Sequence, residues 1–194
     1  MAVKKSRSIK YIFTVLIGTF IIAVLLGGGT EAVLRFFPAS LTWVLLIIVI
    51  LTGIIFDIIG IAVTAADEAP HHARAAKKVF GAKQSVFLIK RCDKVANFAN
   101  DIVGDITGTL SGAMGATIVI SLVNQYPQLE SWKVLLNVLF LGVIASLTVA
   151  GKAWGKTLAI NEANRIVDIT GRFIAGLEKF TGLNFTGANK RGGK

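Results

Sequence analysis

Three acidic residues lie inside stretches of sequence that are otherwise apolar. Asp57 falls about two-thirds of the way along the run 40–65, and Asp101 and Asp105 lie four positions apart in a later run. Asn97 comes four residues before Asp101, so these polar side chains share one face if the later run is helical. Carboxylate and amide oxygens are the ligands that Mg2+, Ca2+ and Na+ prefer. The pattern therefore predicts a cation-binding or proton-relay site formed by Asp57, Asn97, Asp101 and Asp105.

A lysine offers these carboxylates a different partner. Lys152 and Lys156 lie four residues apart at the end of another apolar run. An ammonium group at this position can neutralise an acid inside the same protein and form a structural ion pair. The spacing of the residues leaves both interpretations open, because acids within a membrane are enriched at functional sites but are also commonly paired.

Small residues accompany the acids. Gly104, Gly108 and Gly112 follow one another at intervals of four. This spacing lets helix backbones approach closely in lipid, so we expect the three glycines to pack against another helix. The contact is either within the chain or along the axis of a symmetric dimer.

The composition indicates which elements must position these residues. The chain has 194 residues, of which 54% are hydrophobic and 16% are charged, whereas about 25% are charged in an average soluble protein. Four apolar runs are long enough to cross a bilayer, at 11–27, 40–65, 96–123 and 134–151. The first run could be a signal peptide, but it is long for one and lacks a small-residue cleavage site, so we expect a retained helix. The sequence thus predicts an all-α integral membrane protein with four transmembrane helices.

The basic residues predict the orientation of these helices. Of the 21 Lys and Arg residues, all except Arg35 and Lys133 lie before the first run, between the second and third runs, or after the fourth run. By the positive-inside rule, both termini and the segment 67–95 are cytoplasmic. The protein is therefore predicted to be a multi-pass protein of the cell (plasma) membrane. The net charge of +10 follows from this topology, so the expected partner is the lipid bilayer and not nucleic acid.

The segments outside the apolar runs also show a pattern. Apolar residues recur with helical spacing in 67–95 and 158–180, with basic residues between them. These segments are predicted to be amphipathic juxtamembrane helices on the cytoplasmic leaflet. We expect a single transmembrane domain over 11–180, preceded by a basic N-terminus at 1–10 and followed by a flexible basic tail at 181–194.

Other chemically capable residues give weaker patterns. His71 and His72 lie close to Asp67 and Glu68. Adjacent histidines on a helix point about 100° apart, so a solvated turn is a better interpretation than a metal site. Cys92 has no histidine nearby and is interpreted as an ordinary thiol. No triad spacing, phosphate-binding loop or dinucleotide fingerprint is present, so neither an enzyme nor an organic cofactor is expected.

Four short motifs follow one another along the chain. They are FDIIGIA at 56–62, ARAAK at 73–77, VGD at 103–105 and GKAWGKTLA at 151–159. Their order resembles the transmembrane domain of the CorC/CNNM magnesium-transporter family over residues 45–174. The resemblance implies transport or homeostasis of a divalent, Mg2+-like cation by a homodimer.

The same resemblance implies roles for individual residues. In that family, serine hydroxyls, an asparagine and a glutamate hold the cation. The matching positions here are Asp57, Ile59, Asp105 and Lys152, so the resemblance implies Asp57 and Asp105 as metal ligands. A lysine cannot ligate Mg2+, and its ammonium can fill the space of the cation. Lys152 is therefore expected to act as a counter-ion or gate, with Asp57, Asp101 and Asp105 lining the site and Asn97 flanking it.

Two further expectations come with the resemblance. The paired nucleotide-binding modules of the family are not expected in so short a segment after Phe180, so a separate cytoplasmic regulatory protein is a possible partner. The alternative function is a non-transporting membrane adaptor, in which a buried Lys–Asp ion pair replaces the cation site.

Overall fold

The computed structural model describes residues 12–25, 27–28 and 39–183. Helices and the turns between them account for this part of the chain, and no strand occurs in it. The prediction of an all-helical chain is confirmed. The predicted N-terminal segment 1–10 and most of the predicted tail 181–194 lie outside the described residues.

The chain divides into two compact units. Unit 1 comprises residues 1–50 and 106–145, and unit 2 comprises residues 51–105 and 146–194. Because the long helices pass from one unit into the other, each unit contains pieces of several elements. The two units are described separately below.

Three helices are long and apolar enough to cross a membrane. They are Leu41–Ala65, Cys92–Gln125 and Pro127–Asn161, close to the predicted spans 40–65, 96–123 and 134–151. A shorter apolar helix occupies Ile12–Leu25. The structure therefore shows three candidate spans, and a fourth span at 11–27 stays a prediction.

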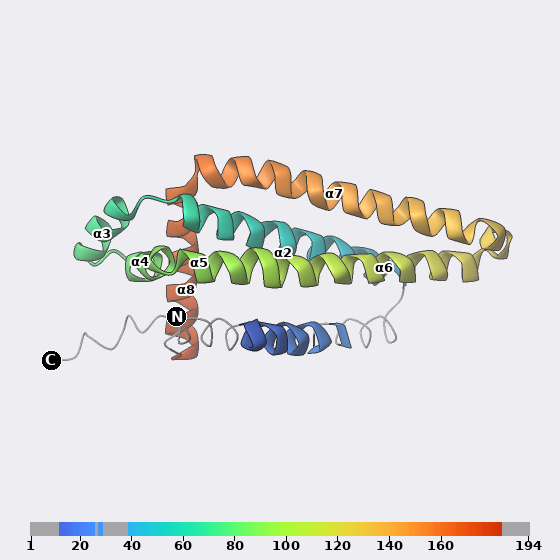
Figure 1. The fold of residues 1–194 in the computed structure, drawn as a ribbon, viewed down its shortest axis with the longest axis horizontal. Coiled ribbons are helices and arrows are strands. Elements are labelled where there is room, and N and C mark those ends of the chain that lie inside the picture. Colours follow the sequence, from blue (N-terminus) through green and yellow to red (C-terminus); the bar gives the residue numbers. More distant parts are fainter. Residues whose placement is uncertain (1–11, 26, 29–38, 184–194) are drawn as a thin grey trace, which may run out of the picture. The chain divides into compact units, whose positions relative to one another are not determined.

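The helices follow one another with short connections (Figure 1). Their order is α2 (Ala39–Ala65), α3 (Glu68–Ala76), α4 (Ala82–Lys90), α5 (Cys92–Ala96), the π-helix η1 (Asn97–Val103), α6 (Gly104–Gln125), the 3-10 helix η2 (Pro127–Trp132), α7 (Lys133–Asn161) and α8 (Ala163–Thr181). The predicted amphipathic segment 67–95 thus consists of short helices. Residues 158–161 of the other predicted segment belong to α7.

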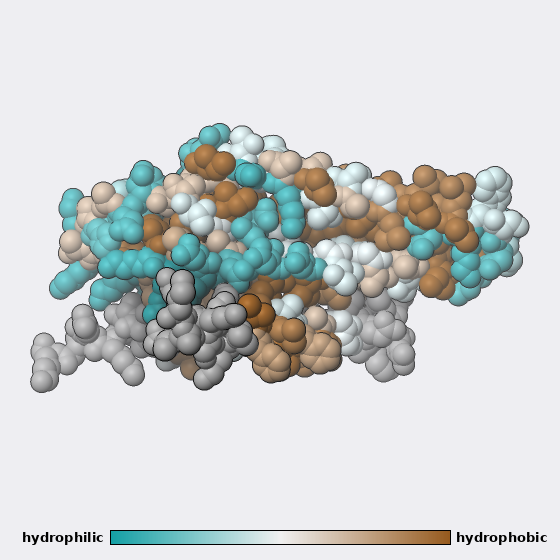
Figure 2. Space-filling view, viewed as in Figure 1, coloured by the Kyte–Doolittle hydropathy of each residue, from teal (hydrophilic) through white to brown (hydrophobic). Residues whose placement is uncertain are grey.

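Unit 1 has a small core and a large apolar surface. Leu46 of α2 packs with Met114, Ile118 and Ile144 in this core. Many other apolar side chains point outward, and Val134 of α7 is 78% exposed. Brown, hydrophobic surface covers much of α7 in Figure 2. An exposed apolar surface of this extent is unusual for a water-soluble protein and suits contact with lipid.

Unit 2 has its own core, to which the long helices α2 and α7 each contribute an end. The buried residues come from α2, α4, α7 and α8, and they are Ala62, Val63, Leu88, Ile89, Ala159 and Val167. Hydrophilic side chains gather over α3 and α4 (Figure 2). Helix α8 runs across the ends of α2 and α7 that belong to this unit (Figure 1).

A glycine in the α3–α4 connection sets the packing of α4 on α8. Gly81 has a φ of 82°, a left-handed conformation that glycine adopts at low cost. A Cβ atom at Gly81 would lie 2.6 Å from the Cα of Arg172, so a larger residue would push α8 away. Gly171 packs equally closely against Ser85. The Ser85 hydroxyl donates a hydrogen bond to the carbonyl of Val167 at 3.2 Å, which ties the two helices together.

Candidate functional site

Two glycines bring α7 against α2 within unit 2. A Cβ atom at Gly155 would lie 2.7 Å from Ile58, and one at Gly151 would overlap the side chain of Ile54. The glycines and the isoleucines are each four residues apart, so one face of α7 lies along one face of α2. These two glycines form a GxxxG motif, a spacing that is typical of close helix packing. From the sequence we considered the glycines of α6 and did not identify this motif on α7.

The close packing sets Lys152 beside Asp57. The Lys152 Nζ atom lies 3.8 Å from Asp57 Oδ1, and the two side chains are 29% and 16% exposed. The two groups form an ion pair, although their separation exceeds the length of a direct hydrogen bond. The internal ion pair that the sequence offered as one of two interpretations is therefore present.

The ion pair lies well inside both helices. Asp57 comes eight residues before the end of α2, which is about 12 Å along a helix axis. Lys152 comes nine residues before the end of α7, a similar depth. If these helices cross a bilayer at this level, a charge without a partner would cost several kcal/mol, and an ion pair reduces such a cost.

A π-helix passes next to the ion pair. Helix η1 covers Asn97–Val103, and π-helical turns within helices are frequent at functional sites. Its Asn100 lies directly against Gly60 of α2, where a Cβ atom would overlap the amide oxygen. That oxygen is buried and has no hydrogen-bond partner among the described residues. A Cβ atom at Gly104, where α6 begins, would lie 3.2 Å from Lys152 Nζ, so the ammonium also borders the helix backbone.

Two polar contacts involve the predicted cation ligands. Asp57 is paired with Lys152, and the Asn97 amide donates a hydrogen bond to the Asp101 carboxylate. Asp101 and Asp105 are exposed. Within residues 12–25, 27–28 and 39–183, no group of three or more His, Cys, Asp or Glu side chains is arranged to hold a metal ion. The assignment of Asp57, Asn97, Asp101 and Asp105 to a cation site stays a prediction.

The glycines of α6 differ in their surroundings. Within unit 1, Gly108 has no atom near its Cβ position, and Gly112 makes an ordinary contact of 3.8 Å with Leu141. The tight contact in this unit is at Gly115, where a Cβ atom would overlap Ile144. The proposed use of Gly104, Gly108 and Gly112 as a packing surface also stays a prediction.

A second polar cluster joins α3 to α8. Asp168 is 6% exposed, and its Oδ2 forms ion pairs with Arg74 at 3.0 Å and with Arg172 at 2.9 Å. Asp67 and Asn164 are linked twice, because the Asp67 amide donates to Asn164 Oδ1 at 2.9 Å and Asn164 Nδ2 donates to Asp67 Oδ2 at 3.2 Å. The sequence carried one signal for this cluster, the spacing of four between Asp168 and Arg172.

His71 belongs to the same region and is almost fully buried. It is 2% exposed, and neither ring nitrogen has a hydrogen-bond partner among the described residues. Burial lowers the pKa of His71 below its usual value. The prediction of a solvated turn is therefore wrong for His71, because α3 packs this face against the rest of unit 2. His72 is solvated, since its side chain is 45% exposed and lies 3.8 Å from Glu68, but it belongs to helix α3 and not to a turn.

Comparison with protein-family models, with curated proteins and with solved structures found no match. The resemblance to the CorC/CNNM family therefore rests on the four sequence motifs alone.

Proposed function

We propose that this chain is an integral membrane protein of cation transport or cation homeostasis, in which Lys152 occupies the cation position until a cation displaces it. The observation that carries the proposal is the Asp57–Lys152 ion pair, which joins α2, whose sequence contains no other charged residue, to a second helix of membrane-crossing length. Ionisable residues within spans are expensive and mark ion pathways more often than chance. The pair therefore serves as the starting point for a mechanism.

The mechanism is an exchange of cations at Asp57. In the resting state the Lys152 ammonium neutralises the carboxylate at 3.8 Å. An incoming cation binds the same carboxylate, and the long lysine side chain extends toward the end of α7, where water or headgroups solvate it. Asn97, Asp101 and Asp105, on and just after η1, supply further oxygen ligands along the path, and Mg2+ or a similar divalent cation is the proposed substrate.

The topology in this proposal has four spans, including 11–27, with both termini and the helices α3, α4 and α8 on the cytoplasmic side of the plasma membrane. The distribution of Lys and Arg supports it. The apolar face of α8, which exposes Ile169 and Phe173 at 58% and 66%, suits a helix lying at the membrane surface. We also propose a homodimer, with a separate cytoplasmic protein as a possible regulator.

A flux assay tests the proposal. Purified protein in liposomes is compared for uptake of Mg2+, Mn2+, Co2+ and Na+, with Asp57→Asn as the test variant and Lys156→Met as the control. Lys156 lies one turn from Lys152 and is exposed. We expect uptake of at least one cation, reduced at least tenfold by Asp57→Asn and less than twofold by the control. Absence of uptake for all four cations would contradict the transport function.

A second candidate is the non-transporting adaptor, and the same ion pair supports it. If Lys152 only neutralises Asp57, the pair is structural, and the working surface is the basic cytoplasmic face of α3, α4 and α8. The adaptor predicts no uptake of any cation together with a large loss of stability in either single variant of the pair.

A further inference from the structure

An open apolar groove lies in unit 2 and is distinct from the Asp57–Lys152 pair. It has a volume of 730 Å³ and is bordered by α2, α4, the α5–η1 segment and α8. This volume is within the range of about 300–1,000 Å³ that is typical of sites for small organic ligands. Its walls include the exposed apolar side chains Ile55, Phe98, Ile169 and Phe173. Large apolar side chains left open in this way are typical of a site that binds an apolar ligand or of a surface that contacts lipid.

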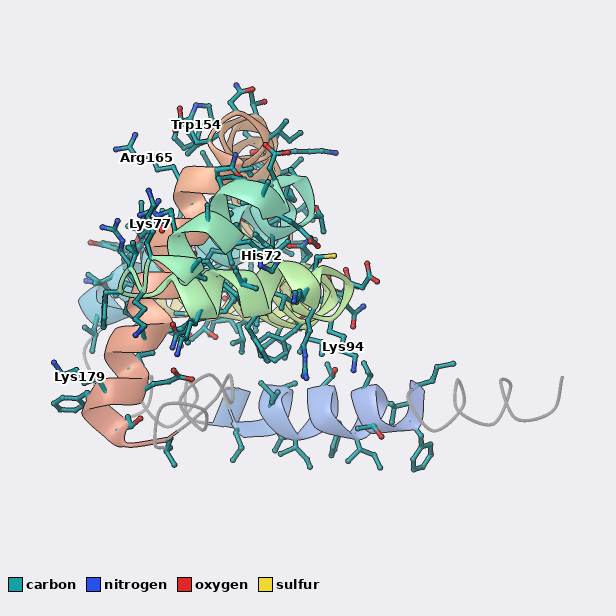
Figure 3. All side chains as sticks on the ribbon, turned by 90° about the vertical axis from the view of Figure 1, so that its left-hand side faces the viewer. His72, Lys77, Lys94, Trp154, Arg165 and Lys179 are labelled. Atoms are coloured by element: carbon teal, nitrogen blue, oxygen red, sulfur yellow. The ribbon has the colours of Figure 1, made fainter. Side chains whose placement is uncertain are left out.

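The charged residues at the groove are basic. Arg91 and Lys94 lie along it, and the described residues that line it include no acid. The Arg91 guanidinium stacks over the ring of Phe87 at 4.6 Å from the ring centroid, which holds the cation against the apolar wall. In Figure 3, Lys94 projects from a different side of unit 2 than Lys77 and Arg165. The groove thus combines an apolar interior with two cations at its edge.

The position of the groove indicates where its ligand comes from. Ile55, Phe56 and Ile59 belong to a helix of membrane-crossing length and composition. Arg91 lies between α4 and α5. Lys94 lies on α5, near the start of the next helix of membrane-crossing length, Cys92–Gln125. An occupant would therefore have its apolar part at the level of the bilayer and its anionic part at the basic edge. A phospholipid with an anionic headgroup has this arrangement.

We propose that this groove binds one anionic phospholipid, with an acyl chain along Ile55, Phe98 and Phe173 and the phosphate and headgroup at Arg91 and Lys94. This inference is independent of cation transport, because none of these residues belongs to the proposed cation path. Binding at such a site favours one headgroup, whereas general contact with the bilayer does not.

Native mass spectrometry of the delipidated full chain in detergent tests the proposal. Phosphatidylglycerol and phosphatidylcholine with the same acyl chains are titrated in parallel. We expect one phosphatidylglycerol to bind at least tenfold more tightly than phosphatidylcholine. The variant Arg91→Gln with Lys94→Gln should reduce this preference to less than twofold. The control Lys77→Gln with Arg165→Gln removes the same two charge types elsewhere on unit 2 and should leave the preference unchanged.

A second pair of variants tests the apolar part. Ile169→Trp fills the groove from an exposed position and should weaken binding of both lipids at least fivefold, while Ile160→Trp, at an exposed position on α7 outside the groove, should not. Equal binding of the two lipids, an equal loss of preference in the control pair, or unchanged binding in Ile169→Trp would overturn the proposal. If Ile169→Trp instead abolishes a dimer without changing lipid binding, the occupant is a second copy of the chain and the proposal is wrong.

Discussion

At the scale of single residues, Asp57 has few ways to avoid an uncompensated negative charge in a helix of membrane-crossing length. The carboxylate can bind a cation, take up a proton or pair with a base, and its neighbour at 3.8 Å is the Lys152 ammonium. A tethered ammonium is a cation that cannot leave, so it can hold a site ready for exchange. The same residue can also lock the site permanently, which is why the two proposed functions share one pair.

The ion pair gives a prediction about stability. Asp57→Asn leaves an unpaired ammonium, and Lys152→Met leaves an unpaired carboxylate. Because both side chains are partly exposed, each variant should lower the free energy of unfolding by about 1–3 kcal/mol, the cost of leaving such a group without its partner. The double variant removes both charges and should recover to within about 1 kcal/mol of the wild type. Unfolding by a denaturing detergent in mixed micelles measures these values. Additive losses in the double variant would show that the two residues do not interact.

His71 gives a prediction about pH. Burial lowers its pKa in the folded protein below 6.5, so below pH 6.5 the unfolded chain binds a proton that the folded protein excludes. The contribution of His71 to stability is therefore complete above pH 6.5 and declines as the pH falls below it. The variant His71→Leu should lose stability less steeply than the wild type between pH 7.5 and 5.5 in thermal unfolding. His72→Gln is the control and should follow the wild-type slope; an identical slope in His71→Leu would contradict the prediction.

At the scale of elements, the contact of α7 with α2 decides where Lys152 lies. Gly155 is buried and has Ile58 at 2.7 Å from its Cβ position, whereas Gly142 on the same helix is exposed with no neighbour there. Gly155→Leu should therefore destabilise the protein by about 1–3 kcal/mol through overpacking, and Gly142→Leu should not. Unfolding in mixed micelles compares the two variants. Equal effects would mean that α7 does not pack on α2 through its glycines.

The sequence predicted elements better than it predicted contacts. Continuous apolar runs indicated the helices α2, α6 and α7 because a span must satisfy its backbone hydrogen bonds internally. The π-helix at Asn97–Val103, in which Asn100 lies against Gly60, was not predicted, because the acids in this run were placed with the spacing of an ordinary α-helix. Without the phase of the π-helix, the face shared by the acids could not be assigned reliably. Burial of His71 was missed because it depends on how α3 packs.

At the scale of the whole molecule, the distribution of charge predicts a topology. Cysteines introduced at Lys77, Lys133 and Lys179 in a Cys92→Ala background should report it with an impermeant thiol reagent on intact cells. We expect the cysteine at 133 to be labelled from outside, and those at 77 and 179 only after permeabilisation. Labelling of all three from the same side would contradict the positive-inside assignment.

The central claim is that Lys152 and a transported cation compete for Asp57. The most direct test is the dissociation constant of Mg2+ for the purified protein, measured by equilibrium dialysis in wild type, Lys152→Met and Asp57→Asn. Removing the competing ammonium should tighten Mg2+ binding at least tenfold in Lys152→Met, and binding should be lost in Asp57→Asn. Equal dissociation constants in wild type and Lys152→Met, or binding that persists in Asp57→Asn, would contradict the account.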